Sequence, residues 1–203
     1  ILVNGYPYKK ADSRVKGHPF LINDSWSDAT IFIKNKKFEE KKIKYDIHND
    51  VVILKSKIGN NNFKIVQLNK FLVDSFHLNP PISRHFVKSS IYLKDKEKPD
   101  FYEKIYNYKE TLFVRKLRKN FENSSGGTNH GKFSQTYDSR YMIKNNNIKK
   151  VNNRYSFIKY FPKEKRTYIR KYFRNKDLNY SQATIYELKK LSNYCFKILN
   201  EKK

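Results

Sequence analysis

Cysteine, acidic residues and long hydrophobic runs are all scarce in this chain of 203 residues. Its single cysteine, Cys195, excludes an intramolecular disulfide. No apolar run approaches the roughly 18–20 residues of a membrane span, so we expect no membrane-spanning segment. Because the chain starts at Ile1 rather than at a methionine, the lack of a signal peptide does not indicate a cytoplasmic location.

The scarcity of acidic residues leaves a strongly basic protein. There are 19 Asp and Glu against 44 Lys and Arg, and the net charge is +25. A surface of this charge suits nucleic acid, an anionic membrane or an acidic protein partner. Lys outnumbers Arg by 35 to 9, whereas proteins that read DNA sequence rely on Arg for bidentate contacts to guanine. Lys, together with the 22 Asn and 18 Ile, has AT-rich codons, so genome composition is an alternative source of part of the charge.

Three parts are predicted from the changes in hydrophobic pattern. Residues 1–28 are rich in turns and read as an extended N-terminal arm, whose Phe20, Leu21 and Trp26 dock on the rest of the chain. Residues 29–153 read as an antiparallel β body, with a polar loop at 119–132. Residues 154–203 read as a helical region that packs on the sheet.

Alternating polar and apolar residues define the β body. Ile43, Tyr45 and Ile47 alternate with polar residues, as expected for a strand with one face in water. Short runs separated by turns predict further strands at 51–58, 63–68, 72–76, 86–93, 102–108 and 112–116, and a hairpin over 141–150.

Two helices are predicted near the C-terminus. Pro162 suits a first helical position, and the spacing of Asn179 and Gln182 resembles a capping box before the apolar stripe that includes Leu188 and Cys195. The predicted fold class is therefore α+β, with an antiparallel β meander or partly closed barrel and two short C-terminal helices.

No residue pattern predicts a catalytic, cofactor or metal site. The segment from Gly126 to Lys132 has phosphate-loop spacing, but Phe133 follows where a Ser or Thr should bind magnesium. Glu39-Glu40-Lys41 matches one part of a nuclease site without the other carboxylates that two-metal chemistry needs, and we interpret it as a solvated hairpin. The five histidines share no metal-ligand spacing, and Cys195 suits a core position.

Basic clusters and loops supply the candidate contact residues. Charged helix residues interleaved with aromatics suit single-stranded nucleic acid, but the same aromatics also suit a buried helix face with a basic side in water. The candidates for binding come from the arm, the strand end near 115–118, the 119–132 loop and the helix after Pro162. They are Phe20, Trp26, Arg115, Lys116, Arg118, His130, Lys132, Lys163, Arg166, Arg170, Lys171 and Arg174.

Several segments resemble one protein family along most of the chain. The segments are Gly17-His18-Pro19-Phe20-Leu21, Ser27 to Ile31, Ile43 to Asp50, Leu112 to Arg118, Phe133 to Lys144, Phe161 to Asn175 and Asn179 to Tyr194. Together they resemble a family of exported, mostly uncharacterised Bacteroidota proteins that are rich in β structure. The family offers no catalytic residue to transfer to this chain.

The resemblance implies a periplasmic protein associated with the outer membrane. One role that it suggests is the plug of the type 9 secretion translocon, which closes an outer-membrane β-barrel by steric occlusion. The expected partner is then an outer-membrane barrel or translocon subunit with an acidic cavity, which a basic surface would complement. The alternative is a nucleic-acid-binding module that uses the Lys-rich surface.

Overall fold

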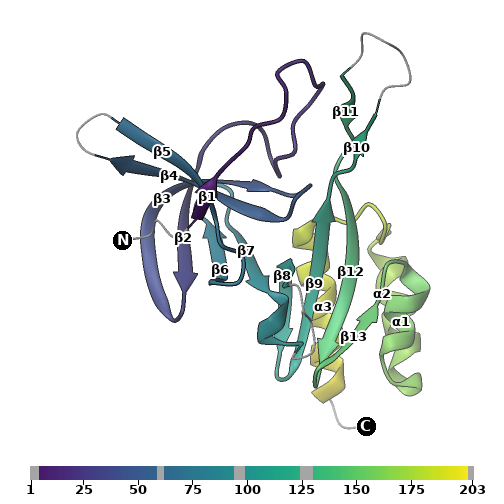
Figure 1. Cartoon of the computed structure of the whole chain (residues 1–203). Coiled ribbons are helices and arrows are strands. Elements are labelled where there is room, and N and C mark those ends of the chain that lie inside the picture. The colour runs from purple at the N-terminus through teal and green to yellow at the C-terminus, as the bar shows by residue number, and fades with distance from the viewer. Residues whose placement is uncertain (1–4, 59–61, 94–98, 124–129, 201–203) are drawn as a thin grey trace. The chain divides into compact units, whose positions relative to one another are not determined.

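Antiparallel strand pairing dominates the fold, as the alternating pattern predicts, and helices follow near the C-terminus. The computed structural model describes residues 5–58, 62–93, 99–123 and 130–200 (Figure 1). The chain divides into two units, one formed by residues 1–103 with 116–138 and the other by 104–115 with 139–203. Each unit therefore contains two separate stretches of sequence.

The first unit is an antiparallel sheet. Its strands follow the order β1-β5-β4-β3-β2-β6-β7-β8, with β1 at the edge. The strand order does not return to its first strand, so the sheet is open and the predicted partly closed barrel is not confirmed. The strands are β1 (Gly5–Pro7), β2 (Ser27–Ile33), β3 (Lys36–Asp46), β4 (Val51–Ile58), β5 (Asn62–Leu68), β6 (Val73–Leu78), β7 (Arg84–Lys88) and the start of β8 (Phe101–Tyr108).

Two predicted segments of this unit differ from the structure. The strand expected over 86–93 ends at Lys88, and a 3-10 helix, η1 (Ser89–Ile91), follows because Tyr92 and Leu93 donate back to the Ser89 carbonyl. The polar loop expected over 119–132 contains a short ribbon instead. In this ribbon β10 (Phe121–Glu122) pairs with β11 (Lys132–Phe133). The glycine-rich stretch at 124–129 lies outside the described residues.

A β-bulge changes the direction of β3. Ala29 pairs with Lys41 and Ile31 pairs with Phe38, so Glu39 and Glu40 together occupy one position opposite β2. Glu40 adopts a φ of 52°, in the left-handed region that residues with side chains rarely occupy. A bulge bends its strand, and this one lies where β3 parts from β4.

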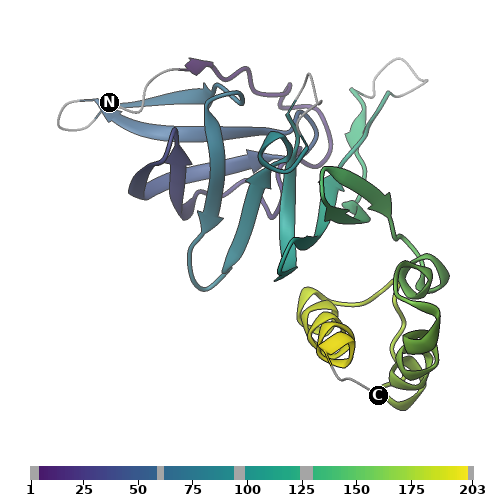
Figure 2. The same ribbon diagram turned by 90° about the horizontal axis from the view of Figure 1, so that it is seen from below.

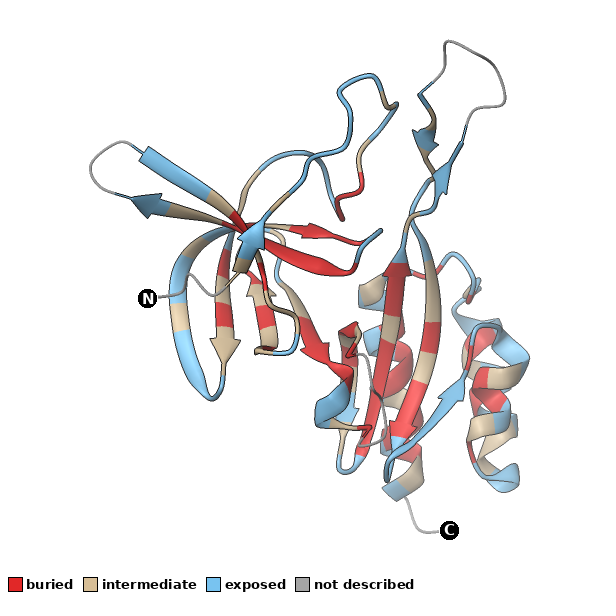
Figure 3. Ribbon diagram, in the orientation of Figure 1, coloured by how far each residue is buried: buried red, intermediate tan, exposed pale blue. Residues whose placement is uncertain are grey.

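Aromatic rings fill the core of the first unit. The Tyr45 ring lies 5.1 Å from Phe76, 5.0 Å from Phe86 and 6.1 Å from Phe101, in edge-on arrangements that aromatic pairs prefer. The alternation of β3 thus directs Ile43 and Tyr45 inward, as predicted. Figure 3 shows this buried interior in red and the exposed ends of β4 and β5 in blue.

The arm that precedes β2 docks on this core. Leu21 N donates to Tyr45 O at 2.9 Å, and Ile47 N donates to Pro19 O at 3.0 Å. Phe20 is consequently only 7% exposed. Near the start of the arm, β1 pairs with β5, so this short part of the N-terminal segment belongs to the sheet.

A buried ion cluster lies beside the aromatic core. Asp50 accepts hydrogen bonds from the Tyr45 hydroxyl and from Phe101 N, the latter at 3.2 Å. Its carboxylate also pairs with Lys70 and lies 2.5 Å from Lys116 Nζ. Burial lowers the pKa of Lys116, although the carboxylates near it act in the opposite direction. This network satisfies charges that would be costly to bury alone.

The second unit combines strand ends with three helices. Its strands are the end of β8, most of β9 (Thr111–Arg118), β12 (Tyr137–Lys144) and β13 (Asn147–Lys150). Asn145 and Asn146 both have positive φ, which forms the tight turn predicted between β12 and β13. Figure 2 shows α3 (Ile185–Asn200) in yellow and α1 (Arg154–Tyr160) with α2 (Arg166–Asn175) in green.

The helix starts differ from those predicted. Helix α1 begins at Arg154 because Asn153 and Ser156 form a capping box, with Ser156 N donating to Asn153 Oδ1 at 2.8 Å. Pro162 instead precedes a 3-10 turn, η2 (Lys163–Lys165), before α2. Helix α3 is capped by Thr184 with Glu187 rather than by Asn179, whose side chain accepts from Ser181 N in a turn. The two predicted helices correspond to α2 and α3, and α1 is an additional helix that precedes them.

The core of the second unit surrounds Phe157. Its ring lies 5.6 Å from Phe113, 5.3 Å from Phe161 and 5.2 Å from Tyr180. Cys195 belongs to the same core and is fully buried, as its place on the apolar stripe predicts. Burial raises the pKa of its thiol well above the ordinary value, so the thiol stays protonated.

Candidate functional site

Two hairpins of the first unit separate and leave an opening between β3 and β4. Pairing between these two strands ends at Lys42 with Lys55. Beyond that point β3 continues against β2 as far as Lys36, whereas β4 continues against β5 as far as Ile58. Figure 1 shows the β4–β5 hairpin and the β2–β3 hairpin leaving the sheet in different directions.

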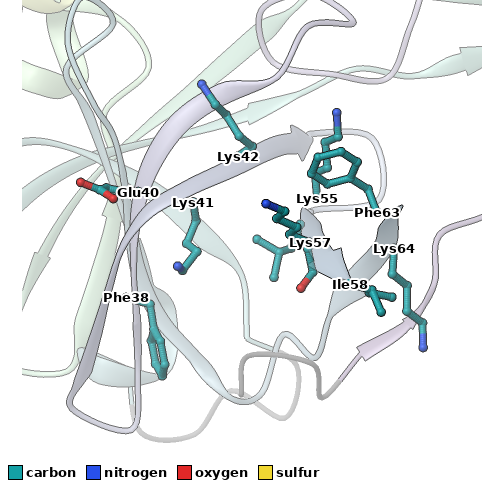
Figure 4. A pocket seen from close by; sticks show the side chains of 11 residues that line it. Phe38, Glu40, Lys41, Lys42, Lys55, Lys57, Ile58, Phe63 and Lys64 are labelled. Carbon is teal, nitrogen blue, oxygen red and sulfur yellow. The ribbon is translucent and has the colours of Figure 1, made fainter. Parts of the chain in front are cut away.

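We call this opening the lysine fork. It has a volume of about 850 Å³ and is lined by five lysines together with apolar and small polar residues. This size lies within the range of about 300–1,000 Å³ that is usual for ligand sites. The lining residues are Phe38, Glu40, Lys41, Lys42, Leu54, Lys55, Ser56, Lys57, Ile58, Phe63 and Lys64 (Figure 4).

Most of the positive charge in the fork is not neutralised. Lys42 pairs with Asp28 at 2.8 Å, and Lys55 Nζ lies 4.2 Å from the centre of the Phe63 ring. Lys41, Lys57 and Lys64 form no ion pair with the residues that the structure describes. Figure 4 shows Lys41 and Lys57 extending into the space between the strands, with Glu40 on the other side of β3. The fork therefore presents a positive potential.

Exposed apolar groups accompany this charge. Phe63 is 53% exposed and Ile58 is 52% exposed, although both are large hydrophobic residues. They lie at the ends of β5 and β4, next to Lys57 and Lys64. An anionic ligand with some apolar surface would match both features of the fork.

The predicted contact residues of the first unit do not gather at one site. Lys116 is only 3% exposed and belongs to the buried ion cluster, which corrects its expected place on the surface. Phe20 is also buried, and the Lys44 ammonium lies 4.9 Å from the ring centres of both Phe20 and Trp26. The Phe20 ring is thus buried, whereas Trp26 is partly exposed.

Three other candidates of the first unit lie outside the core. Arg118 and His130 are exposed. Lys132 is exposed on β11 and lies 3.2 Å from Glu122 on β10. None of these residues lines the lysine fork.

The remaining candidates belong to the second unit. Lys163, Arg170, Lys171 and Arg174 are exposed on η2 and α2, whereas Arg115 is partly buried on β9. Arg166 donates to the carbonyl oxygens of Phe161 and Lys159, each at 2.8 Å, so its guanidinium closes the end of α1. The structure thus places four of these five helix-region cations in the solvent.

The helix aromatics divide between core and surface. Ile169 and Phe173 are buried, as a core face requires. Tyr168 is 51% exposed, and Tyr155 on α1 is 71% exposed. The buried residues fit a helix face that packs in the core, and the exposed tyrosines fit a surface that could contact single-stranded nucleic acid.

The fork itself was not predicted. Glu39, Glu40 and Lys41 were interpreted as a solvated hairpin, and Glu39 does pair with Lys37 at 2.5 Å in solvent. The available signal was the presence of exposed apolar residues, Ile58 and Phe63, between lysines at a strand end. Strands β3 and β4 diverge because β3 follows β2 and β4 follows β5, and no local sequence pattern indicates this pairing.

The described residues show neither a cluster of metal ligands nor a membrane-spanning helix. They contain no group of three or more His, Cys, Asp or Glu residues that could hold a metal ion. Among the helices described, none is long and apolar enough to cross a membrane.

Comparison of the chain with protein-family models, with curated proteins and with solved structures finds no match.

Proposed function

We propose that this chain is a non-enzymatic binding protein whose lysine fork holds an acidic segment of a protein partner. The observation that carries the proposal is the convergence of Lys41, Lys57 and Lys64 on one opening without ion-pair partners among the described residues. Like charges that are held together raise each other's energy, and an acidic ligand removes this cost. Exposed Ile58 and Phe63 add apolar contact area at the same place.

The fork suits an acidic protein segment better than it suits DNA whose guanine bases must be recognised. All five cations of the fork are lysines, which act as compact point charges rather than as planar bidentate donors. The overall charge of +25 would also increase the rate of encounter with an acidic partner. The lysines of the fork and the overall charge therefore both support this class of ligand.

The proposal includes a location. From the resemblance to exported Bacteroidota proteins, we propose that the chain acts in the periplasm on an outer-membrane barrel or translocon subunit with an acidic cavity. Its action there is steric occlusion, as in a plug. Affinity capture with the full chain from outer membranes tests this part, and recovery of no outer-membrane protein would contradict it.

Single-stranded nucleic acid is a second candidate ligand. Tyr155 and Tyr168 are exposed on α1 and α2, next to the exposed Arg154 and Arg170. Exposed rings stack on bases while cations follow the phosphates. This candidate concerns the second unit and not the fork.

Binding of defined probes separates the two candidates. We would measure the fluorescence anisotropy of a labelled glutamate-rich peptide and of a labelled deoxythymidine oligonucleotide, each with the full chain. A triple charge reversal in the fork, Lys41→Glu with Lys57→Glu and Lys64→Glu, should weaken peptide binding at least tenfold. Each lost contact of about 0.5–1 kcal/mol is sufficient, since about 1.4 kcal/mol is tenfold.

A matched variant controls for net charge. Lys9, Lys176 and Lys189 are exposed and lie outside the fork, so their reversal to Glu makes the same change in total charge. This control should retain most of the peptide affinity. Equal loss in both triple variants would show that only the overall charge matters and would contradict the proposal. Binding of the oligonucleotide alone would favour the second candidate.

A further inference from the structure

The lysine fork leaves strand edges without a neighbouring strand. Residues 37–41 of β3 pair on one side with β2, and residues 56–58 of β4 pair on one side with β5. Their pairing with each other stops at Lys42 and Lys55. Along each strand the backbone groups point alternately to the two sides, so some donors and acceptors of both segments face the fork.

We propose that the fork receives an extended acidic strand of the partner, which pairs with the backbone of β4 beyond Lys55. This inference rests on the proposed function and specifies its binding mode. Beyond Lys55, β4 pairs regularly with β5 as far as Ile58, whereas β3 is interrupted by the bulge at Glu39 and Glu40. A regular strand is the better template for a guest strand.

The alternation of side chains places lysines on both faces of a guest strand. Lys41 follows the alternation of Ile43 and Tyr45 in β3, so it lies on the same face of the sheet as these buried residues. Lys55 and Lys57 alternate with the buried Leu54 and therefore lie on the opposite face. Side chains of a guest would therefore meet cations on either face, so a guest with acidic residues on one face finds a cation whichever face they occupy.

One cross-strand pair of lysines beside the fork supports an acidic guest. Lys42 and Lys55 are direct partners across β3 and β4, and like charges in this position destabilise a sheet. Lys42 is neutralised by Asp28, but Lys55 contacts the Phe63 ring instead of a carboxylate. A carboxylate from a guest strand next to Lys55 and Lys57 would neutralise the charge that Lys55 retains.

The open edge of β4 defines the length of the paired part of the guest. Three residues of β4, from Ser56 to Ile58, lie beyond Lys55, and a strand rises about 3.3 Å per residue, so the open edge is about 10 Å long. A guest that pairs through about three residues therefore fits.

The lysines also explain why such an edge is safe in the free protein. Charged side chains on free strand edges, especially lysines, prevent pairing with other exposed edges. Lys57 on this edge thus disfavours neutral and basic strands, and the same charge selects an acidic one. Selectivity for acidic over neutral strands is a measurable consequence.

Backbone-modified peptides test the strand pairing. The parent probe is a labelled ten-residue peptide of alternating Glu and Val, and two isomers carry N-methyl groups on every Glu or on every Val. N-methylation removes the donors along one edge of the peptide and leaves the charge unchanged. With the full chain, we expect the parent to bind and at least one isomer to bind at least tenfold more weakly. A peptide of alternating Gln and Val should also bind at least tenfold more weakly than the parent.

The outcomes distinguish this inference from the proposed function. If the parent and both N-methylated isomers bind equally well, the acidic segment binds without strand pairing and only the present inference is wrong. If the parent does not bind at all, both are wrong. If the Gln peptide binds as tightly as the parent, charge does not select the guest and the inference fails. The fork charge reversal should abolish the difference between the parent and its isomers.

Discussion

Replacement of Asp50 by Asn should destabilise the first unit strongly. The Asp50 carboxylate lies 2.5 Å from Lys116 Nζ, and the two side chains are 11% and 3% exposed. Asparagine retains the size of the side chain, but it leaves Lys116 with the Phe101 carbonyl at 3.2 Å and with one carboxylate, Asp100, at 3.5 Å. Loss of one partner of a buried pair costs about 3–5 kcal/mol. Because Asp100 remains, we expect the lower end of this range, about 3 kcal/mol.

Two companion variants isolate the cause. Asp28→Asn removes the 2.8 Å ion pair between Asp28 and Lys42. The side chains of Lys42 and Asp28 are 53% and 55% exposed, so the loss should lower the stability by only about 0.2–1 kcal/mol. Adding Lys116→Met to the Asp50→Asn variant removes the uncompensated buried charge. The double variant should therefore be more stable than Asp50→Asn alone.

Urea unfolding monitored by the fluorescence of Trp26 measures these differences. Trp26 is the one tryptophan of the chain, and it lies in the first unit. With a denaturant dependence of about 1–3 kcal/mol per molar urea, a loss of 3 kcal/mol lowers the midpoint by about 1–3 M. Equal midpoints for Asp50→Asn and Asp28→Asn would refute the reasoning. So would a double variant that is no more stable than Asp50→Asn.

Two other predictions concern the second unit. Cys195 is fully buried, and burial raises the pKa of its thiol. A thiol reagent at pH 8 should therefore leave Cys195 unmodified in the native protein and modify it in urea. Rapid reaction in the native protein would contradict the burial of Cys195 in the core. Thr184→Ala should lower the stability of the second unit by about 1 kcal/mol, measured as the urea dependence of Cys195 labelling, because Thr184 caps α3 together with Glu187. The exposed Thr167 on α2 supplies a control, since Thr167→Ala should have little effect.

Local patterns were sufficient for most strands. Ile43 and Tyr45 alternate with lysines, and β3 buries these two residues as predicted. The consecutive positions Asn145, Asn146 and Asn147 predict a tight turn because Asn tolerates positive φ, and the turn between β12 and β13 lies there. These features depend on a few neighbouring residues, so the sequence alone can reveal them.

The start of a helix could not be predicted from the capping pattern alone, because two pairs of residues near α3 fit that pattern. Asn179 with Gln182 and Thr184 with Glu187 have the same spacing, and the sequence pattern favoured the first pair. The second pair caps α3, because Asn179 accepts from Ser181 N within a turn. A short helix such as α1, which is held mainly by packing of Phe157 against the core, gives too little periodicity to be recognised.

The candidate site depends on pairing between segments that are distant in sequence. Lys41 and Lys57 come together only because β3 follows β2 and β4 follows β5 beyond Lys42 and Lys55. Burial of Lys116 likewise depends on Asp50 and Asp100, far from it in the chain. Strand divergence and ion clusters of this kind have no local signature, so charge in the sequence alone did not locate the site.

The alternation of the two units along the chain has a consequence for genetic dissection. The segment 104–115 of the second unit is inserted between the two segments of the first, and 116–138 of the first is inserted between the two segments of the second. A cut after residue 138 therefore keeps every residue of the first unit, but it also keeps the segment 104–115 of the second. Truncation after residue 138 would leave Ile105 and Phe113 without the helices whose side chains form their core. Loss-of-function alleles of the second unit should therefore be designed as point substitutions, because truncation would leave part of its core without packing partners.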